Sequence, residues 1–148
     1  MADPAFSFIC GTDDFWVNRE AKALFDEASK DVADPEFGLE IVNGAAGNVA
    51  EVEDSVNRFA SAVQTLSLFG DSKVVWFKDI TFLADSVTGR AEGTLTQVDR
   101  LKELLQGIDP ASVTVILSAS PIDRRRSFQK WCEKHSKYTL ADSGKPAE

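Results

Sequence analysis

Short apolar runs alternate with apolar stripes at helical spacing along most of the chain. The runs are bounded by glycine, proline or polar clusters, which is typical of strands. They lie at residues 5–10, 37–47, 73–80, 112–120 and 137–141. The stripes recur every three or four positions, which predicts helices within residues 13–28, 48–63, 95–108 and 123–135. Residues 85–92 carry neither pattern and are predicted to form a polar loop.

The alternation of strands and helices defines the expected fold. Strands 73–80 and 112–120 are apolar at most positions, which is typical of strands covered on both faces. We therefore expect an α/β fold with three layers, in which helices flank a largely parallel sheet of about five strands. The chain has 148 residues, 43% of them apolar and 27% charged, which fits one soluble domain. We expect this domain to occupy residues 1–140, with residues 141–148 as a linker or frayed tail.

Charge and cysteine content narrow the function classes. A formal net charge of −8 argues against a general nucleic-acid-binding surface, which needs a basic footprint. Residues 122–138 depart from this balance, with six Arg or Lys against two acidic residues, and a solvated helix face is the usual explanation. The two cysteines show neither metal-ligand spacing nor a disulfide framework, which indicates a reduced interior. No signal peptide or membrane span is found, so we expect a cytoplasmic location and no membrane partner.

The loop after the first strand is where a ligand is expected, because parallel α/β sheets bind ligands beyond the carboxyl ends of their strands. Residues 10–16 read CGTDDFW, with one glycine, no lysine, and neither a P-loop nor a GxGxxG motif. Asp13 and Asp14 would repel a polyphosphate at this place. They could in principle bind Mg²⁺ or act as acid and base, but capping of the following helix explains them first. We expect no nucleotide bound in the standard way.

Other catalytic constellations are equally incomplete. His135 is the only histidine, and we expect it on the apolar side of its helix beside Trp131, as a packed or partly satisfied imidazole and not a catalytic one. A Ser-His-Asp triad would need Ser118 or Ser120 to reach His135, and neither serine lies in a GxSxG elbow. We therefore predict no catalytic residues, no metal and no cofactor. Because the sequence contains so few candidate catalytic residues, a function based on binding to a partner is favoured.

The junction between the second predicted helix and the third predicted strand contains two large apolar residues whose role is not clear from periodicity. Residues 64–73, QTLSLFGDSK, join the second helix to the third strand, and Leu68 and Phe69 are followed at once by Gly70. Periodicity alone favours the pair as the last turn of a core stripe, although Phe69 fits that stripe only roughly. The alternative is a pair held outward to bind a partner, with Gly70 letting the chain turn sharply after it.

Four stretches together resemble the N-terminal domain of the delta subunit of bacterial DNA polymerase III, a clamp-loader subunit. They are GTDDFWVNREA at 11–21, IVNGAAG at 41–47, QTLSLFGDSKVVWFKD at 64–79 and VTVILSASPIDRRRSFQKW at 113–131. The third and fourth, in that order, are the most specific. The resemblance runs from about Phe6 to Tyr138. Asn18 and Arg19 stand where the family often has acids, and Trp76 is heavier than the usual aliphatic residue.

The resemblance implies an AAA+-like first domain, a degenerate P-loop NTPase fold that has lost its nucleotide site. It also implies that the domain docks on the sliding clamp (the beta subunit) and helps to open the ring during DNA replication, without binding ATP itself. The matching clamp-binding residues are Gln64, Leu66, Ser67, Leu68 and Phe69. Other clamp-loader subunits would be contacted through lid and collar domains after residue 148, and DNA only within the full complex.

Alternatives to this interpretation stay open at the level of sequence. Arg124, Arg125 and Arg126 are a possible partner or DNA surface: a solvated face ranks first, an acidic clamp surface or neighbouring subunit second, and DNA contact by this domain alone third. Two other functions compete with clamp docking. One is a P-loop-type nucleotide-dependent enzyme with a degenerate site, and the other is an orphan α/β binding domain for another acidic or apolar partner.

Overall fold

Five parallel strands form a single sheet in the order β2-β3-β4-β1-β5. The computed structural model describes residues 6–30, 32, 38–64, 73–109, 112–120, 122–123 and 125–141. Its strands are β1 (Phe6–Cys10), β2 (Leu39–Asn43), β3 (Lys73–Ile80), β4 (Val113–Ala119) and β5 (Lys137–Leu140). The predicted α/β fold with a parallel sheet and flanking helices is confirmed.

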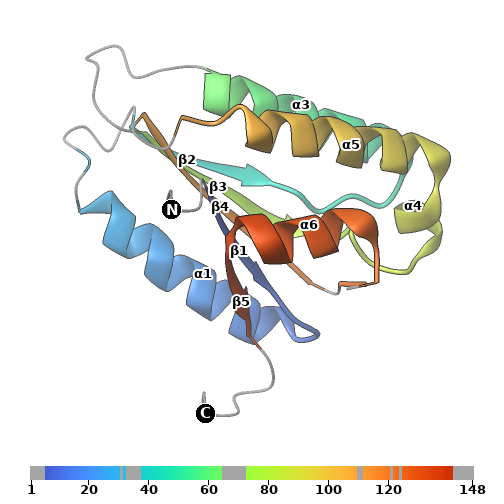
Figure 1. Ribbon diagram of the computed structural model, residues 1–148, viewed down its shortest axis with the longest axis horizontal. Coiled ribbons are helices and arrows are strands. Elements are labelled where there is room, and N and C mark those ends of the chain that lie inside the picture. The colour runs from blue at the N-terminus through green and yellow to red at the C-terminus, as the bar shows by residue number, and fades with distance from the viewer. Residues whose placement is uncertain are drawn as a thin grey trace.

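The helices cover the two faces of the sheet unequally. They are α1 (Asp14–Ser29), α3 (Val49–Gln64), α4 (Val87–Arg90), α5 (Glu92–Gln106) and α6 (Ser127–His135). The step from β1 to β2 runs across the sheet in the opposite direction to the later steps. Since β-α-β crossovers are right-handed, α1 lies on one face while α3, α5 and α6 lie on the other. Figure 1 shows α1 on one side of the sheet, with α3 and α5 together on the other.

Each face of the sheet buries its own apolar cluster. On the face covered by α3, the rings of Phe59 and Phe77 stack with centroids 4.8 Å apart. On the α1 face, Phe25 packs on Trp76 at 5.3 Å, and the Trp76 indole donates a 2.9 Å hydrogen bond to Ser118 Oγ. Alternate side chains of β3 therefore enter opposite clusters, which explains why this strand is so apolar.

Polar side chains set where two of the helices begin. Asp13 is the N-cap of α1, and its carboxylate accepts a 3.0 Å hydrogen bond from the amide of Phe15. Asn48 precedes α3 and accepts a 2.9 Å hydrogen bond from the amide of Glu51. The helix-capping interpretation is therefore confirmed for Asp13, and Asp14 lies in the first helical turn.

Three local predictions are wrong. Residues 85–92 are not a loop throughout, because Ser86 caps the short helix α4 by accepting a 2.9 Å hydrogen bond from the Gly89 amide. Leu95, the first apolar position of the stripe predicted at residues 95–108, does lie in α5 but is 42% exposed, so the stripe does not face the core at that point. His135 is exposed, although its ring does stack on Trp131 at 5.2 Å. A four-residue helix, and the ends of longer helices, offer too few positions for periodicity to distinguish inside from outside.

Candidate functional site

The loop after β1, where a parallel sheet would bind a ligand, is covered at its first residue, Gly11, by the chain itself. Ala141 follows β5 and donates a 2.8 Å hydrogen bond from its amide to the carbonyl of Cys10. The Ala141 carbonyl lies so close to Gly11 that a Cβ on this glycine would come within 2.0 Å of it. Gly11 is therefore needed for the packing of the chain after β5. The Asp13 carboxylate adds negative charge where a polyphosphate would sit, which disfavours the P-loop alternative.

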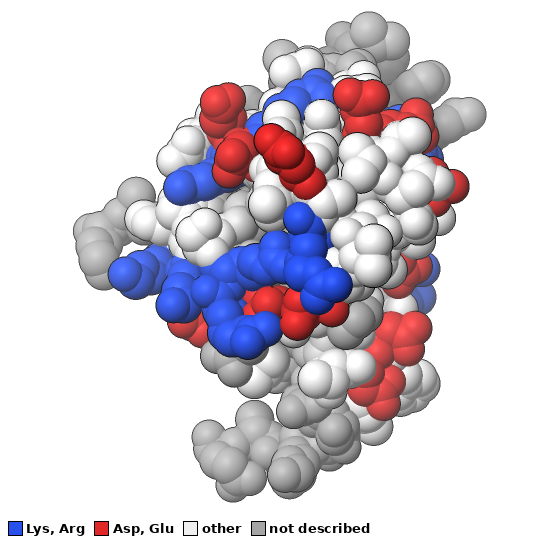
Figure 2. Space-filling view, turned by 90° about the vertical axis from the view of Figure 1, so that its right-hand side faces the viewer, with Lys and Arg blue, Asp and Glu red and all other residues white. Residues whose placement is uncertain are grey.

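An arginine–aspartate network joins the segments that follow β3 and β4. Arg125 pairs with Asp123 at 2.8 Å and with Asp85 at 3.4 Å, and Arg126 contacts Asp123 at 3.4 Å. Figure 2 shows Lys and Arg side chains as a band across this side of the molecule, next to acidic side chains. Two of the three predicted partner-facing arginines are thus paired within the chain, and Arg124 lies outside the described residues.

The network holds its central carboxylate in the charged form. Hydrogen bonds from the Arg125 side chain, and next from the Arg125 amide, lower the pKa of Asp123 well below its ordinary value of 3.8. Two hydrogen bonds to main-chain carbonyls support the same junction: the Asp123 amide donates to Leu83 O at 2.9 Å, and the Arg126 side chain donates from Nη1 to Gly89 O at 3.1 Å. These contacts give the arginines a structural role at the carboxyl edge of the sheet.

The two described residues that flank the predicted docking segment, Gln64 and Lys73, lie at the opposite, amino edge of the sheet. Helix α3 ends at Gln64, which is exposed, and β3 begins at Lys73, whose amide donates to Ser112 O at 3.0 Å. The structure therefore places both ends of the connecting segment near the start of β4. Four of the five predicted residues lie outside the described part of the chain and stay a prediction: Leu66, Ser67, Leu68 and Phe69.

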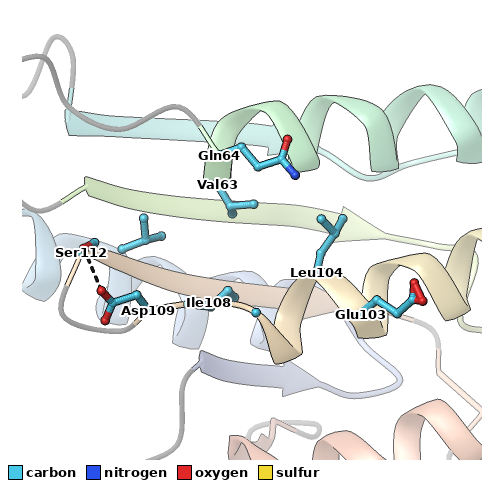
Figure 3. Close-up of a pocket in the computed structure, with 9 residues that line it drawn as sticks. Val63, Gln64, Glu103, Leu104, Ile108, Asp109 and Ser112 are labelled. Atoms are coloured by element: carbon cyan, nitrogen blue, oxygen red, sulfur yellow. Dashed lines mark hydrogen bonds between the residues drawn. The ribbon is translucent and has the colours of Figure 1, made fainter.

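A cavity of about 470 Å³ opens beside this junction, between the carboxyl ends of α3 and α5. Figure 3 shows Val63 of α3 and Leu104 of α5 on its two sides, with Ile108 beyond the end of α5. Gln64 and Glu103 add polar atoms to its lining. An apolar surface with a polar rim therefore lies next to the point where the predicted docking segment leaves α3.

Lys73 is a charged residue of this edge that the sequence analysis missed. The residue is 4% exposed. Its Nζ donates a 2.8 Å hydrogen bond to Ala62 O, in the last turn of α3, and pairs with Glu40 Oε1 at 2.9 Å. Both partners lie on other elements, so no local motif reveals the contact. The one available signal is a lysine at the opening of an otherwise apolar strand.

Two side chains that could act as nucleophiles, Cys132 and Ser118, are fully buried. Burial raises the pKa of the Cys132 thiol far above its ordinary value, which disfavours a thiolate. Ser118 Oγ accepts the hydrogen bond from the Trp76 indole, so it serves the core. Within the described ranges, no three His, Cys, Asp or Glu side chains gather into a group that could hold a metal ion. The helices in that part of the chain are all too short or too polar to cross a bilayer.

Comparisons with known proteins confirm the predicted resemblance. The family model described as DNA polymerase III, delta subunit, matches residues 8–141. Among solved structures, the chain is similar to the Bacillus subtilis DNA clamp loader delta protein (YqeN), with a TM-score of 0.65 and 15% sequence identity over 95% of this chain and 39% of that chain. The chain thus spans less than half the length of that protein, and no curated protein matches. Since the family model covers most of its length, the chain belongs to the DNA polymerase III delta subunit family.

Proposed function

We propose that this domain binds the sliding clamp through residues 66–69, with Gln64 at their base, and so helps to open the ring. The observation that carries the proposal is the family match over residues 8–141, which includes this segment. The surroundings support it, because the segment leaves α3 and enters β3 beside an apolar cavity. At the competing place after β1, Ala141 covers Gly11 and the helix cap Asp13 carries a carboxylate.

In this proposal Leu68 and Phe69 supply most of the binding free energy. Burying a large apolar side chain in a partner pocket contributes about 1.5–3 kcal/mol, which is the range of interface hot spots. Two adjacent anchors therefore contribute about 3–6 kcal/mol, or roughly two to four orders of magnitude in affinity. The control of binding by ATP belongs to other subunits, because this domain has no P-loop.

A binding titration of this domain against the purified clamp tests the proposal. The unchanged domain should bind, and the double change Leu68→Ala with Phe69→Ala should remove detectable binding while the thermal unfolding temperature stays the same. Phe15→Ala is the matched control: it deletes a phenyl ring that is 61% exposed, on the first turn of α1 at the other edge of the sheet. This control should bind the clamp like the unchanged domain.

Two results would contradict the proposal at different levels. If the unchanged domain fails to bind the clamp, the proposed function is wrong. If the domain binds and the double variant binds equally well, clamp docking stands, but residues 66–69 are not the element that performs it.

Arg125 and Arg126 have a subordinate place in this proposal. Their carboxylate partners assign them to the internal network first. The Arg125 side chain is still 78% exposed, so it is the one we propose to approach an acidic surface of the clamp or of a neighbouring subunit. A rim contact of this kind changes the association rate and its dependence on salt more than the affinity. DNA contact is left to the complete clamp loader.

A further inference from the structure

A buried lysine joins the two ends of the segment that precedes β3. Lys73 is the first residue of β3, and its Nζ reaches back to Ala62 O at 2.8 Å, two residues before α3 ends at Gln64. The same ammonium pairs with Glu40 Oε1 of β2 at 2.9 Å. One side chain therefore contacts the helix from which residues 65–72 depart and belongs to the strand at which they return.

In this contact, the positive charge of Lys73, a residue of β3, lies at the carboxyl terminus of α3. The carbonyl groups of a last helical turn carry partial negative charge and need donors. The last turn of α3 has no basic residue of its own, and Lys73 supplies both the donor and the positive charge from another element. A lysine that is 4% exposed is costly unless its charge is paired, and Glu40 provides that pairing.

We propose that Lys73 is a positioning residue for clamp docking: it fixes the end of α3 against the start of β3, and so presets how the docking segment is presented. This inference rests on the proposed function. A segment whose two ends are fixed to each other has fewer conformations to lose when it binds. Lys73 does not need to touch the clamp for this, because it acts through the helix end that it holds.

Lys73→Met tests the proposal, since methionine keeps most of the aliphatic length and removes the ammonium. In the variant, the amides of the last turn of α3 should exchange with solvent at least tenfold faster relative to those of β4, because the helix end has lost its donor. The affinity for the clamp should fall about tenfold, as expected when preorganisation is lost. The thermal unfolding temperature alone would not distinguish this role from ordinary packing.

Ile116→Val is the control for general destabilisation. Ile116 is buried in the cluster under α1, and this change removes one methylene group from that cluster. The control should lower the unfolding temperature and leave both the clamp affinity and the exchange at the end of α3 unchanged. If it weakens clamp binding as much as Lys73→Met does, the effect of the lysine is only loss of stability and the proposal fails.

Glu40→Gln keeps the test decisive if Lys73→Met does not fold. The Glu40 side chain is 45% exposed, so its amide replacement is compatible with folding, and it weakens the hold on Lys73 from the other side. We expect a smaller loss of affinity, of about threefold, in the same direction. In a domain that binds the clamp, unchanged affinity and unchanged exchange in the folded variants overturn the positioning role. Failure of the unchanged domain to bind overturns the proposed function instead.

Discussion

The carboxyl and amino edges of the sheet differ in the contacts that cover them. At the carboxyl edge, Ala141 packs on Gly11 and Asp123 holds two arginines, so main-chain contacts and ion pairs occupy the place where parallel sheets bind ligands. At the amino edge, Lys73 holds the end of α3 beside an open apolar cavity. The contrast puts the proposed working surface at the edge of the sheet opposite to the one where parallel sheets usually bind ligands.

Gly11→Ala is the strongest test of the contact between Ala141 and Gly11 at the carboxyl edge. The new Cβ would come within 2.0 Å of the Ala141 carbonyl, so the chain after β5 must move. We expect the free energy of unfolding to fall by about 1–3 kcal/mol, as for other overpacked sites. Urea denaturation measures this loss. The clamp affinity of the folded variant should not change, because the two edges are separate.

Gly47→Ala is the control for this change. The atom nearest to a Cβ at Gly47 is Glu51 Oε1, at an ordinary contact distance of 3.5 Å. The free energy of unfolding of the Gly47→Ala variant should therefore stay close to that of the unchanged domain. Equal stability of the two variants would mean that the packing of Ala141 on Gly11 does not close this edge.

Asp123→Asn should produce a smaller, pH-dependent loss of stability. The folded-state pKa of Asp123 lies below its ordinary value of 3.8 because of the Arg125 hydrogen bonds. A carboxylate with a lowered pKa stabilises the fold above the pKa that it has when unfolded, and this contribution is lost as the pH falls toward the folded-state pKa. Unfolding temperatures measured between pH 7 and pH 3 should show the variant below the unchanged domain at neutral pH, with the difference shrinking below about pH 4.

Asp26→Asn is the matched control for the ion pair. Asp26 pairs with Lys22 at 2.8 Å on the surface of α1, where both side chains are more than half exposed. Its effect should be close to zero at every pH. A difference for Asp123→Asn that stays constant with pH would contradict the assigned role of the carboxylate.

Addition of ATP with Mg²⁺ at millimolar concentration should leave the unfolding temperature of the domain unchanged. A ligand present at about a hundred times its Kd adds about 2.7 kcal/mol to the stability of a folded protein, so differential scanning fluorimetry would detect binding. An increase in unfolding temperature that disappears when residues 11–14 are changed would restore the P-loop alternative. It would also show that the carboxyl edge is open to ligands.

Long apolar patterns predicted the architecture of this chain well. The run at residues 73–80 coincides with β3, and the stripes at residues 13–28 and 48–63 fall on α1 and α3. These segments contain enough positions for their periods to be distinct, and their burial on one or both faces follows from composition. The helix α4 was missed because its stability depends on a Ser86 cap and on Gly89 packing closely against Ala84.

The candidate site was predicted less completely than the fold. Family motifs, and not apolar spacing, predict the clamp-binding residues, because spacing alone favours a core role for Leu68 and Phe69. The predicted residues are Gln64, Leu66, Ser67, Leu68 and Phe69. Lys73 stood within the same motif, but its partners Ala62 and Glu40 come from α3 and β2. Contacts between residues that are distant in the sequence produce no periodic pattern, so they cannot be predicted from a single sequence. The pairing of Arg125 and Arg126 with aspartates was hidden for the same reason.

Strand β3 also has a mechanical consequence for the segment that leads into it. It is paired with β2 on one side over Val74–Lys78, and with β4 on the other side from Lys73–Val113 to Phe77–Leu117 and again at Ile80. A pull on Lys73 along the strand therefore loads two parallel ladders in shear, and many hydrogen bonds resist at once. The same pull on β5, an edge strand paired only with β1, would be resisted by one ladder. Tension on the segment that precedes Lys73 is thus transmitted to a strand that is held on both sides.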